Sequence, residues 1–206
     1  MSTPRNLLIA ALLASVGPAF AASSIDLSVR GAITPSACIP GLPNAGVIEL
    51  GKVSAKDLRL DLPTYLPRQT LEMTVTCEAA TLFAIAAQDN REGTESSLDF
   101  YNFGLGLING SEKLGYLTIS MSGPTGDGVS VRAIGSQDGG TTWQRESAFM
   151  DDGLTSVADM TTLAPLPVQR LVTGLQVGTV IAPASNLTLT NEVPIDGSVT
   201  LTISYL

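Results

Sequence analysis

The sequence contains no histidine, and this absence excludes several kinds of catalytic site at once. Without an imidazole there is no Ser-His-Asp triad, no Cys-His pair and no histidine metal site. The two cysteines are too few for a structural zinc site, which takes four ligands that are mostly cysteine and histidine. We therefore expect no cofactor, no bound metal and no enzyme activity, although paired-carboxylate chemistry stays formally open because the chain has 19 acidic residues.

Basic residues and long apolar runs are also scarce. The 206 residues include 11 lysines and arginines against 19 acidic residues, for a net charge of −8. Nucleic acids and anionic membrane surfaces attract basic patches, so this balance argues against both as partners. Beyond the N-terminus no segment reaches the length of about 20 apolar residues that a spanning helix needs, so we expect no membrane insertion.

The N-terminus has the layout of a secretory signal peptide. Arg5 is followed by an uncharged apolar stretch at residues 7–16 and by the sequence Ala-Phe-Ala at 19–21. This order of a charged end, an apolar centre and a small-residue cleavage site is typical of export signals. The apolar centre is too short to cross a bilayer comfortably. We expect cleavage after Ala21 or Ala22.

Residues 22–206 are the expected mature chain after removal of the signal at 1–21. Their number suits a single domain with long loops. In an exported chain an even number of cysteines indicates a disulfide, and two cysteines allow only the pairing of Cys38 with Cys77. Closing a loop of about 40 residues stabilises a fold by roughly 4 kcal/mol on the chain-entropy model.

Helical periodicity is nearly absent after the signal. Apolar and polar residues instead alternate in short stretches that are separated by glycine, proline, asparagine and aspartate, as in half-buried strands. These stretches are residues 25–33, 47–50, 71–77, 82–87, 116–121, 129–132, 171–181, 187–190 and 199–205. The stretch with the weakest strand pattern is 145–167. Many short strands predict an all-β sandwich or barrel.

Residues 136–143 resemble the Asp-box, S-x-D-x-G-x-T-W, which marks hairpin turns in sialidase-like propellers. The matching residues are Ser136, Asp138, Gly140, Thr142 and Trp143. A propeller repeats its motif from blade to blade, whereas this motif occurs once. We interpret it as a structural turn in which Asp138 caps the backbone, Gly140 takes a positive φ and Trp143 packs beneath. A glycan-processing enzyme is a further hypothesis that rests on this match alone.

Both ends of the mature chain carry cleanly alternating stretches. The apolar positions are Ile25, Leu27, Val29 and Ile33 at the start, and Val199, Leu201, Ile203 and Tyr205 at the end. Each stretch could join the edge of a sheet by strand addition, in which main-chain hydrogen bonds give affinity and alternate side chains fill pockets.

Residues 31–38, the spacing of the cysteines and the penultimate Tyr205 resemble the subunits of chaperone–usher fimbriae. More narrowly, several stretches resemble a poorly characterised family of fimbria-associated proteins of Gram-negative bacteria. These stretches are residues 82–84, 103–110, 181–183 and 189–194. The resemblance implies an immunoglobulin-like β-sandwich of pilin type that lacks its final strand and leaves an apolar groove.

The resemblance also implies a function and partners. A periplasmic chaperone fills the groove first, and at an outer-membrane usher the N-terminal extension of a neighbouring subunit replaces it. Carried onto this chain, Ile25, Leu27, Val29 and Ile33 are donor side chains. Val199, Leu201, Ile203 and Tyr205 line the groove edge. The expected role is that of a structural subunit of a surface fimbria in cell adhesion, exported through the periplasm.

Two departures keep an alternative open. Pilins commonly carry a glycine about 14 positions from the C-terminus, where this chain has Val193, with Gly197 nearer the end. Only the 16 residues 22–37 precede Cys38, and they extend over roughly 50 Å at most. Residues 25–33 could instead be the first strand of their own domain. The protein would then be a self-complete β-sandwich that serves as a periplasmic or secreted binding or accessory module.

Overall fold

The computed structural model describes Ser28 and residues 37–206. Residues from 37 onward belong to one compact unit, Pro35–Leu206. This part contains β-strands and three single 3₁₀ turns, with no α-helix among the described residues. The predicted signal peptide and the candidate donor residues Ile25, Leu27, Val29 and Ile33 lie outside the described residues.

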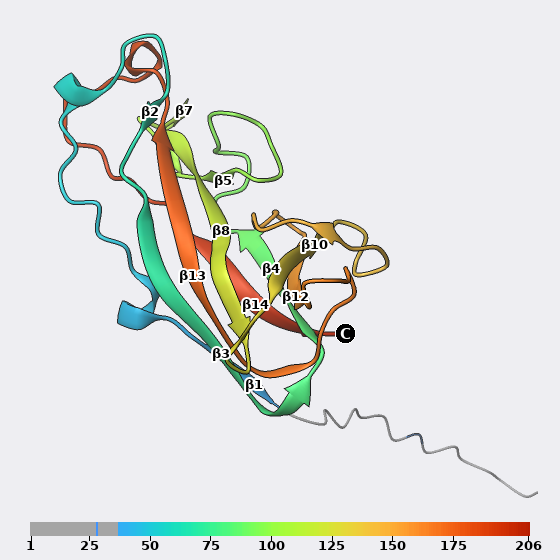
Figure 1. Ribbon diagram of the computed structural model, residues 1–206. Coiled ribbons are helices and arrows are strands. Elements are labelled where there is room, and N and C mark those ends of the chain that lie inside the picture. Colours follow the sequence, from blue (N-terminus) through green and yellow to red (C-terminus); the bar gives the residue numbers. More distant parts are fainter. Residues whose placement is uncertain (1–27, 29–36) are drawn as a thin grey trace, which may run out of the picture. The chain divides into compact units, whose positions relative to one another are not determined.

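The larger of two main sheets has the antiparallel order β1-β3-β13-β8-β5 (Figure 1). Its long central strands are β3 (Gln69–Thr81), β13 (Val168–Ile181) and β8 (Gly115–Gly126). The outer strands are β1 (Cys38–Gly41) and β5 (Phe103–Gly104). Two short strands also join this sheet: β2 (Thr64–Tyr65) on β13 and β9 (Val129–Ser130) on β8.

The second sheet has the order β11-β10-β12-β4-β14. Its strands are β11 (Gln144–Arg145), β10 (Arg132–Ser136), β12 (Leu154–Ala158), β4 (Phe83–Asp89) and β14 (Val199–Tyr205). A separate small hairpin joins β6 (Leu107–Ile108) to β7 (Glu112–Lys113). Among the described strands β14 pairs only with β4, so its other side is a sheet edge.

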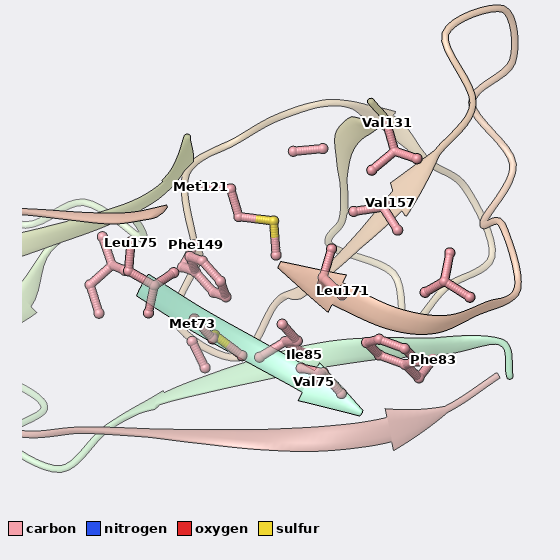
Figure 2. Close-up of a cluster of buried hydrophobic side chains, with 14 of the residues drawn as sticks. Met73, Val75, Phe83, Ile85, Met121, Val131, Phe149, Val157, Leu171 and Leu175 are labelled. Atoms are coloured by element: carbon pink, nitrogen blue, oxygen red, sulfur yellow. The ribbon is translucent and has the colours of Figure 1, made fainter. Parts of the chain in front are cut away.

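Apolar side chains from the inner faces of the two sheets form the core (Figure 2). Met73 and Val75 of β3 face Phe83 and Ile85 of β4, as expected where alternate residues of each strand point inward. Phe149, between β11 and β12, is completely buried in the same core. The predicted all-β sandwich is thus confirmed.

Some predicted strands were wrong, and for one of them a second apolar cluster gives the reason. Residues 47–50 and 187–190 form no strand. Leu187 and Leu189 pack instead against a small cluster around Leu114 and Ile181. Alternating apolar and polar residues indicate that one side of an extended chain is buried. This pattern does not require that the chain pairs with a partner strand.

The opposite error occurs at residues 145–167. The strand pattern is weakest there in the sequence, yet β12 forms inside the second sheet, between β10 and β4. Every residue of β12 after Leu154 is buried, so the strand lacks a polar face and the alternation that reveals one. Ser156 is accommodated there because its hydroxyl donates a hydrogen bond of 2.6 Å to the carbonyl of Phe83.

Thr155 of β12 provides a test of core packing. Its side chain is 1% exposed, and its Oγ1 finds no hydrogen-bond partner among the described residues. A buried hydroxyl without a partner costs about 1–3 kcal/mol. Because valine has nearly the same shape, Thr155→Val is expected to raise the free energy of unfolding by about 1 kcal/mol or more. Urea denaturation measures this change.

The matched control for this prediction is Ser156→Ala. It removes a buried hydroxyl that does donate to Phe83, so it is expected to lower the free energy of unfolding. A Thr155→Val chain that unfolds at lower urea than the parent would show that the hydroxyl is satisfied.

Candidate functional site

An apolar groove of about 780 Å³ runs along the open edge of β14. One wall is formed by Val199 and Leu201 of β14, and the opposite wall by the chain that follows β1. The floor is formed by apolar side chains of the three central strands of the larger sheet: Leu71, Met73, Leu117, Ile119, Leu175 and Val177. The groove therefore exposes the margin of the core between the two sheets.

Among the described residues, the edge of β14 presents both side chains and main-chain groups that have no partner strand. At its two ends Ser198 O accepts from Asn90 N at 3.0 Å, and Leu206 N donates to Leu82 O at 3.2 Å. Because an antiparallel ladder alternates, the residues at the intervening odd positions direct their N–H and C=O groups away from β4. These are Val199, Leu201, Ile203 and Tyr205, the residues that the sequence proposes for this role. The side chains of the first three also pack against the core.

The opposite wall is also free of main-chain pairing. Within residues 37–206, the backbone of residues 48–53 makes no hydrogen bond. Ile48 and Leu50 turn toward the groove, while Glu49 is exposed. Main-chain groups without a protein partner need water or another strand. The groove is thus bordered on both sides by backbone that a further strand could join.

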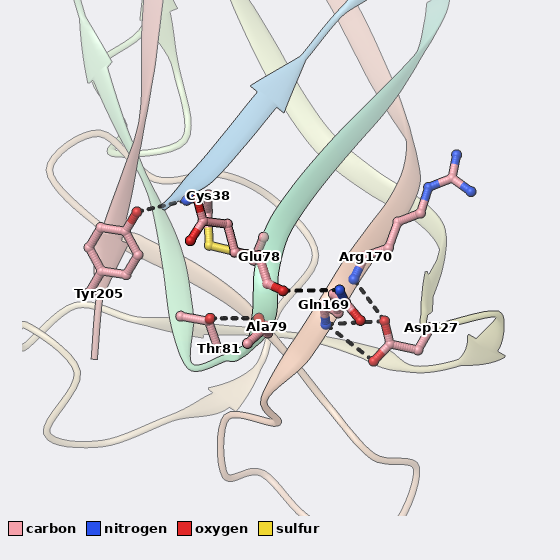
Figure 3. The surroundings of a disulfide bond; sticks show 9 residues. Cys38, Glu78, Ala79, Thr81, Asp127, Gln169, Arg170 and Tyr205 are labelled. Carbon is pink, nitrogen blue, oxygen red and sulfur yellow. Dashed lines mark hydrogen bonds between the residues drawn. A yellow bond between two sulfur atoms is a disulfide. The ribbon is translucent and has the colours of Figure 1, made fainter. Parts of the chain in front are cut away.

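A hydrogen bond between Tyr205 and Cys38 bridges the two sheets beside the disulfide (Figure 3). Cys38 and Cys77 are bonded, as predicted, and stand opposite each other in the ladder of β1 and β3. Cys38 N also donates a hydrogen bond of 2.9 Å to Tyr205 Oη. The tyrosine ring therefore reaches from the edge of one sheet to the first strand of the other.

At the other end of the groove the chain enters β14 through Gly197. A Cβ on this residue would lie 2.6 Å from Leu117 Cδ2 and 2.8 Å from Leu105 Cδ2. Contacts this short are not tolerated without displacement of the leucines, so glycine lets the backbone pass close to the groove floor. Among the described residues, no side chain comparable to Tyr205 bridges the two sheets at this end.

The Asp-box-like residues form a self-contained turn. The Asp138 carboxylate accepts from Ser136 Oγ at 2.7 Å, from Thr142 N at 2.9 Å and from Thr142 Oγ1 at 2.6 Å. Trp143 Nε1 donates to the carbonyl of Gly140 at 3.0 Å, and Gly140 has a φ of +91°. The hydrogen bonds from Thr142, followed by that from Ser136, lower the pKa of Asp138 to about 2. The Asp138 carboxylate is therefore ionised at neutral pH, and its oxygens accept hydrogen bonds from within the turn.

The lowered pKa gives the turn a defined pH dependence. A group whose pKa is depressed on folding stabilises the fold above its ordinary pKa of 3.8, and this contribution is lost as pH falls toward 2. Asp138→Asn is thus expected to lower the melting temperature at pH 7, with a difference from the parent that shrinks toward pH 2. Asp61→Asn is the control because Asp61 is exposed and makes no hydrogen bond to any described residue. A difference that stays constant with pH would contradict the assignment.

Other perturbed groups are also tied into the structure. Tyr101 Oη donates to Glu146 Oε2 at 2.6 Å, and this bond, with some burial, raises the pKa of Tyr101 to about 12. Hydrogen bonds from Thr161 and Thr162 hold the pKa of Asp159 well below its usual range. Nowhere in residues 37–206 do three metal-ligating side chains cluster. No helix in that part has the length and apolar character needed to cross a membrane.

Within the described residues, these features define a disulfide-bonded β-sandwich in which β14 is an unpaired edge beside an apolar groove. Residues 27–107 match the family described as protein of unknown function (DUF1120). The chain is 27% identical over 237 aligned positions to the uncharacterized protein YhcF of Escherichia coli (strain K12), and the alignment covers 98% of each chain. It is 25% identical over 251 aligned positions to the protein GltF of the same organism, again covering 98% of each. The chain is thus a distant relative of proteins from a Gram-negative bacterium.

Of the four residues that the sequence proposes for the groove edge, Val199 and Leu201 line the cavity, whereas Ile203 and Tyr205 are not part of its lining. The wall opposite β14 was not predicted. That wall is formed by residues 48–53. The sequence predicts a strand at the overlapping stretch 47–50, and the structure shows an extended segment without a partner strand there. Glycine at 46 and 51 on either side of that stretch is a signal for a short extended segment without ladder neighbours.

Proposed function

We propose that this protein is a structural subunit of a surface fimbria that assembles by donor-strand exchange and serves cell adhesion. The observation that carries this proposal is the unpaired edge of β14 beside an apolar groove. An exposed apolar edge is a template for aggregation, and proteins generally cover such edges. Addition of a strand from another chain would cover this one with both main-chain hydrogen bonds and apolar contacts.

The N-terminal segment of a neighbouring copy has the pattern that the groove requires. Ile25, Leu27, Val29 and Ile33 share one face of an extended chain, so they could enter the groove together. The intervening polar residues would then face solvent. In this proposal a periplasmic chaperone covers the groove before assembly, and an outer-membrane usher directs the exchange.

The disulfide and the distant relatives support this setting. Disulfides persist in oxidising compartments such as the periplasm and the cell surface. The alignments with the two relatives cover 98% of this chain and 98% of each relative. A signal peptide at 1–21 would deliver the chain to that compartment.

Assembly in solution tests the proposal. The chain from residue 22 onward is expected to form a ladder of non-covalent oligomers that survive mild denaturant, as measured by size-exclusion chromatography with light scattering. The double variant Leu27→Asp and Val29→Asp is expected to be monomeric because it places charges in the apolar groove of the next copy. Ser28→Asp, on the opposite face, is the matched control and should still assemble.

A stable monomer without any chaperone would contradict the proposal. It would favour the second candidate, a self-complete β-sandwich acting as an exported binding or accessory module. In that case the edge of β14 would be covered by the chain's own N-terminal segment.

A further inference from the structure

The hairpin of β6 and β7 turns through Asn109 and Gly110, the only asparagine–glycine pair in the sequence. Both residues are exposed, and their φ angles are +51° and +84°. Asparagine and glycine are the residues that take this left-handed conformation most readily at the centre of a tight turn. Ser111 N closes the turn by donating a hydrogen bond of 3.2 Å to Ile108 O.

The side-chain amide of Asn109 fastens this hairpin to a distant part of the chain. Asn109 Nδ2 donates to Thr188 O at 2.9 Å and to Glu112 Oε2 at 3.1 Å. Glu112 Oε2 also accepts from Thr188 N at 2.6 Å. Within the described residues, the two bonds at Thr188 are the only hydrogen bonds of the main chain of residues 188–195. Side-chain contacts hold the rest of this stretch.

Gly110 leaves the Asn109 side chain open to attack by the main chain. Gly110 N makes no hydrogen bond to any described residue, and nothing lies within 4 Å of the position that a Cβ on Gly110 would take. A main-chain nitrogen can attack the side-chain carbonyl carbon of a preceding asparagine, and glycine hinders this approach least because it has no side chain. Asn191 provides the contrast, because it is exposed and makes no hydrogen bond to a described residue but is followed by Glu192.

We propose that Asn109 is a deamidation site, and that its conversion to aspartate or isoaspartate releases residues 188–195 from the hairpin of β6 and β7. Gly110 N loses its proton to hydroxide and bonds to Asn109 Cγ, and the Cγ–Nδ2 bond breaks with release of ammonia. Water then opens the cyclic succinimide at either of its carbonyl carbons. The net reaction consumes water, releases ammonia and oxidises nothing. This inference is independent of the proposed function.

The conversion removes two donated hydrogen bonds and places a negative charge beside another. A carboxylate only accepts hydrogen bonds, so Thr188 O and Glu112 Oε2 both lose their bond from residue 109. Hydrogen bonds from the main chain and side chain of Thr188, followed by that from Asn109, lower the pKa of Glu112, so this group is ionised at neutral pH. Two carboxylates this close repel each other, which also weakens the bond between Glu112 and Thr188 N.

Peptide mapping by mass spectrometry tests the chemical step. The chain from residue 22 onward is kept folded in mildly alkaline buffer made with heavy-oxygen water, which labels each converted side chain. Asn109 is expected to convert at least about tenfold faster than Asn191, whose amide is freer but is not followed by glycine. Equal rates at the two positions would overturn the proposal. Conversion of Asn109 in urea but not in the folded chain would overturn it as well, because the turn would then protect the amide.

Amide hydrogen exchange at Thr188 tests the release. Asn109→Asp is expected to speed exchange of the Thr188 amide about tenfold, the effect of weakening a hydrogen bond to a charged group. Asn191→Asp is the matched control, because it adds the same charge outside the hydrogen bonds of the hairpin and should leave this exchange rate unchanged. The core amides of β13 should stay protected in both variants, which shows that the chain remains folded.

The converted parent chain provides a second measurement of the release. Anion-exchange chromatography separates it from the unconverted chain because it carries an additional negative charge. Its Thr188 amide is expected to exchange as fast as that of Asn109→Asp. A Thr188 exchange rate equal to that of the parent, in both the converted chain and Asn109→Asp, would overturn the release.

Discussion

Replacing Leu201 with aspartate is expected to weaken binding of the peptide of residues 22–36 by at least about 100-fold while the chain stays folded. Leu201 contributes a side chain to the groove wall and main chain to the open edge. Loss of a buried leucine contact removes about 1.5–3 kcal/mol, and a carboxylate that an incoming strand must desolvate adds to this loss. Because each 1.4 kcal/mol is a factor of ten, the combined effect exceeds two orders of magnitude.

Isothermal titration calorimetry measures this change, with the chain from residue 22 onward carrying Leu27→Asp and Val29→Asp as the receptor, so that its own segment does not compete. Thr202→Asp is the matched control, because it places the same charge one residue further on, at an exposed position of the same strand. Successive strand residues face opposite sides, so this carboxylate should leave the affinity nearly unchanged. If both variants lost the same peptide affinity, a charge anywhere on β14 would weaken binding, and Leu201 would not contact the peptide.

Removal of the disulfide is expected to produce the largest loss of stability. The Cys38–Cys77 bond closes a loop with a sequence separation of 39 residues. Such a loop corresponds to about 4 kcal/mol on the chain-entropy model. For a domain of this size that loss lowers the melting temperature by roughly 8–16 °C. The double variant Cys38→Ala and Cys77→Ala should also loosen the start of β1 and its contact with Tyr205.

Differential scanning calorimetry checks this prediction. The double variant should melt well below the disulfide-bonded parent and at about the same temperature as the parent under reducing conditions. Tyr205→Phe is the comparison that removes only the hydroxyl bonded to Cys38 N. It should lower the melting temperature far less than loss of the disulfide. A double variant that melts within 2–3 °C of the disulfide-bonded parent would contradict the role assigned to the bond.

The features predictable from the sequence are those that local pattern determines. Two cysteines allow one pairing, and the bond is present. The alternation of residues 199–205 is strong because one side of β14 packs on the core and the other faces water. Strand β13 was predictable despite Gly174 and Gly178, because apolar residues continue on both sides of each glycine.

The features that escaped prediction depend on contacts between distant parts of the chain. Burial of both faces hid β12, and the small cluster around Leu114 made residues 187–190 look like a strand. A second cavity of about 500 Å³ forms only because residues 48–58 and 189–195 come together, and no local pattern in either segment predicts that contact.

The central claim is that β14 has an open edge which a strand from another copy completes, and amide hydrogen exchange tests it most directly. The amides of Val199, Leu201 and Ile203, which point away from β4, are expected to exchange rapidly in the monomeric fraction of the unmutated chain from residue 22 onward. They should become protected when the peptide of residues 22–36 is added, while the core amides of β13 stay protected throughout. Protection of the three amides before any peptide is present would contradict the account, because the chain would then have completed its own sheet.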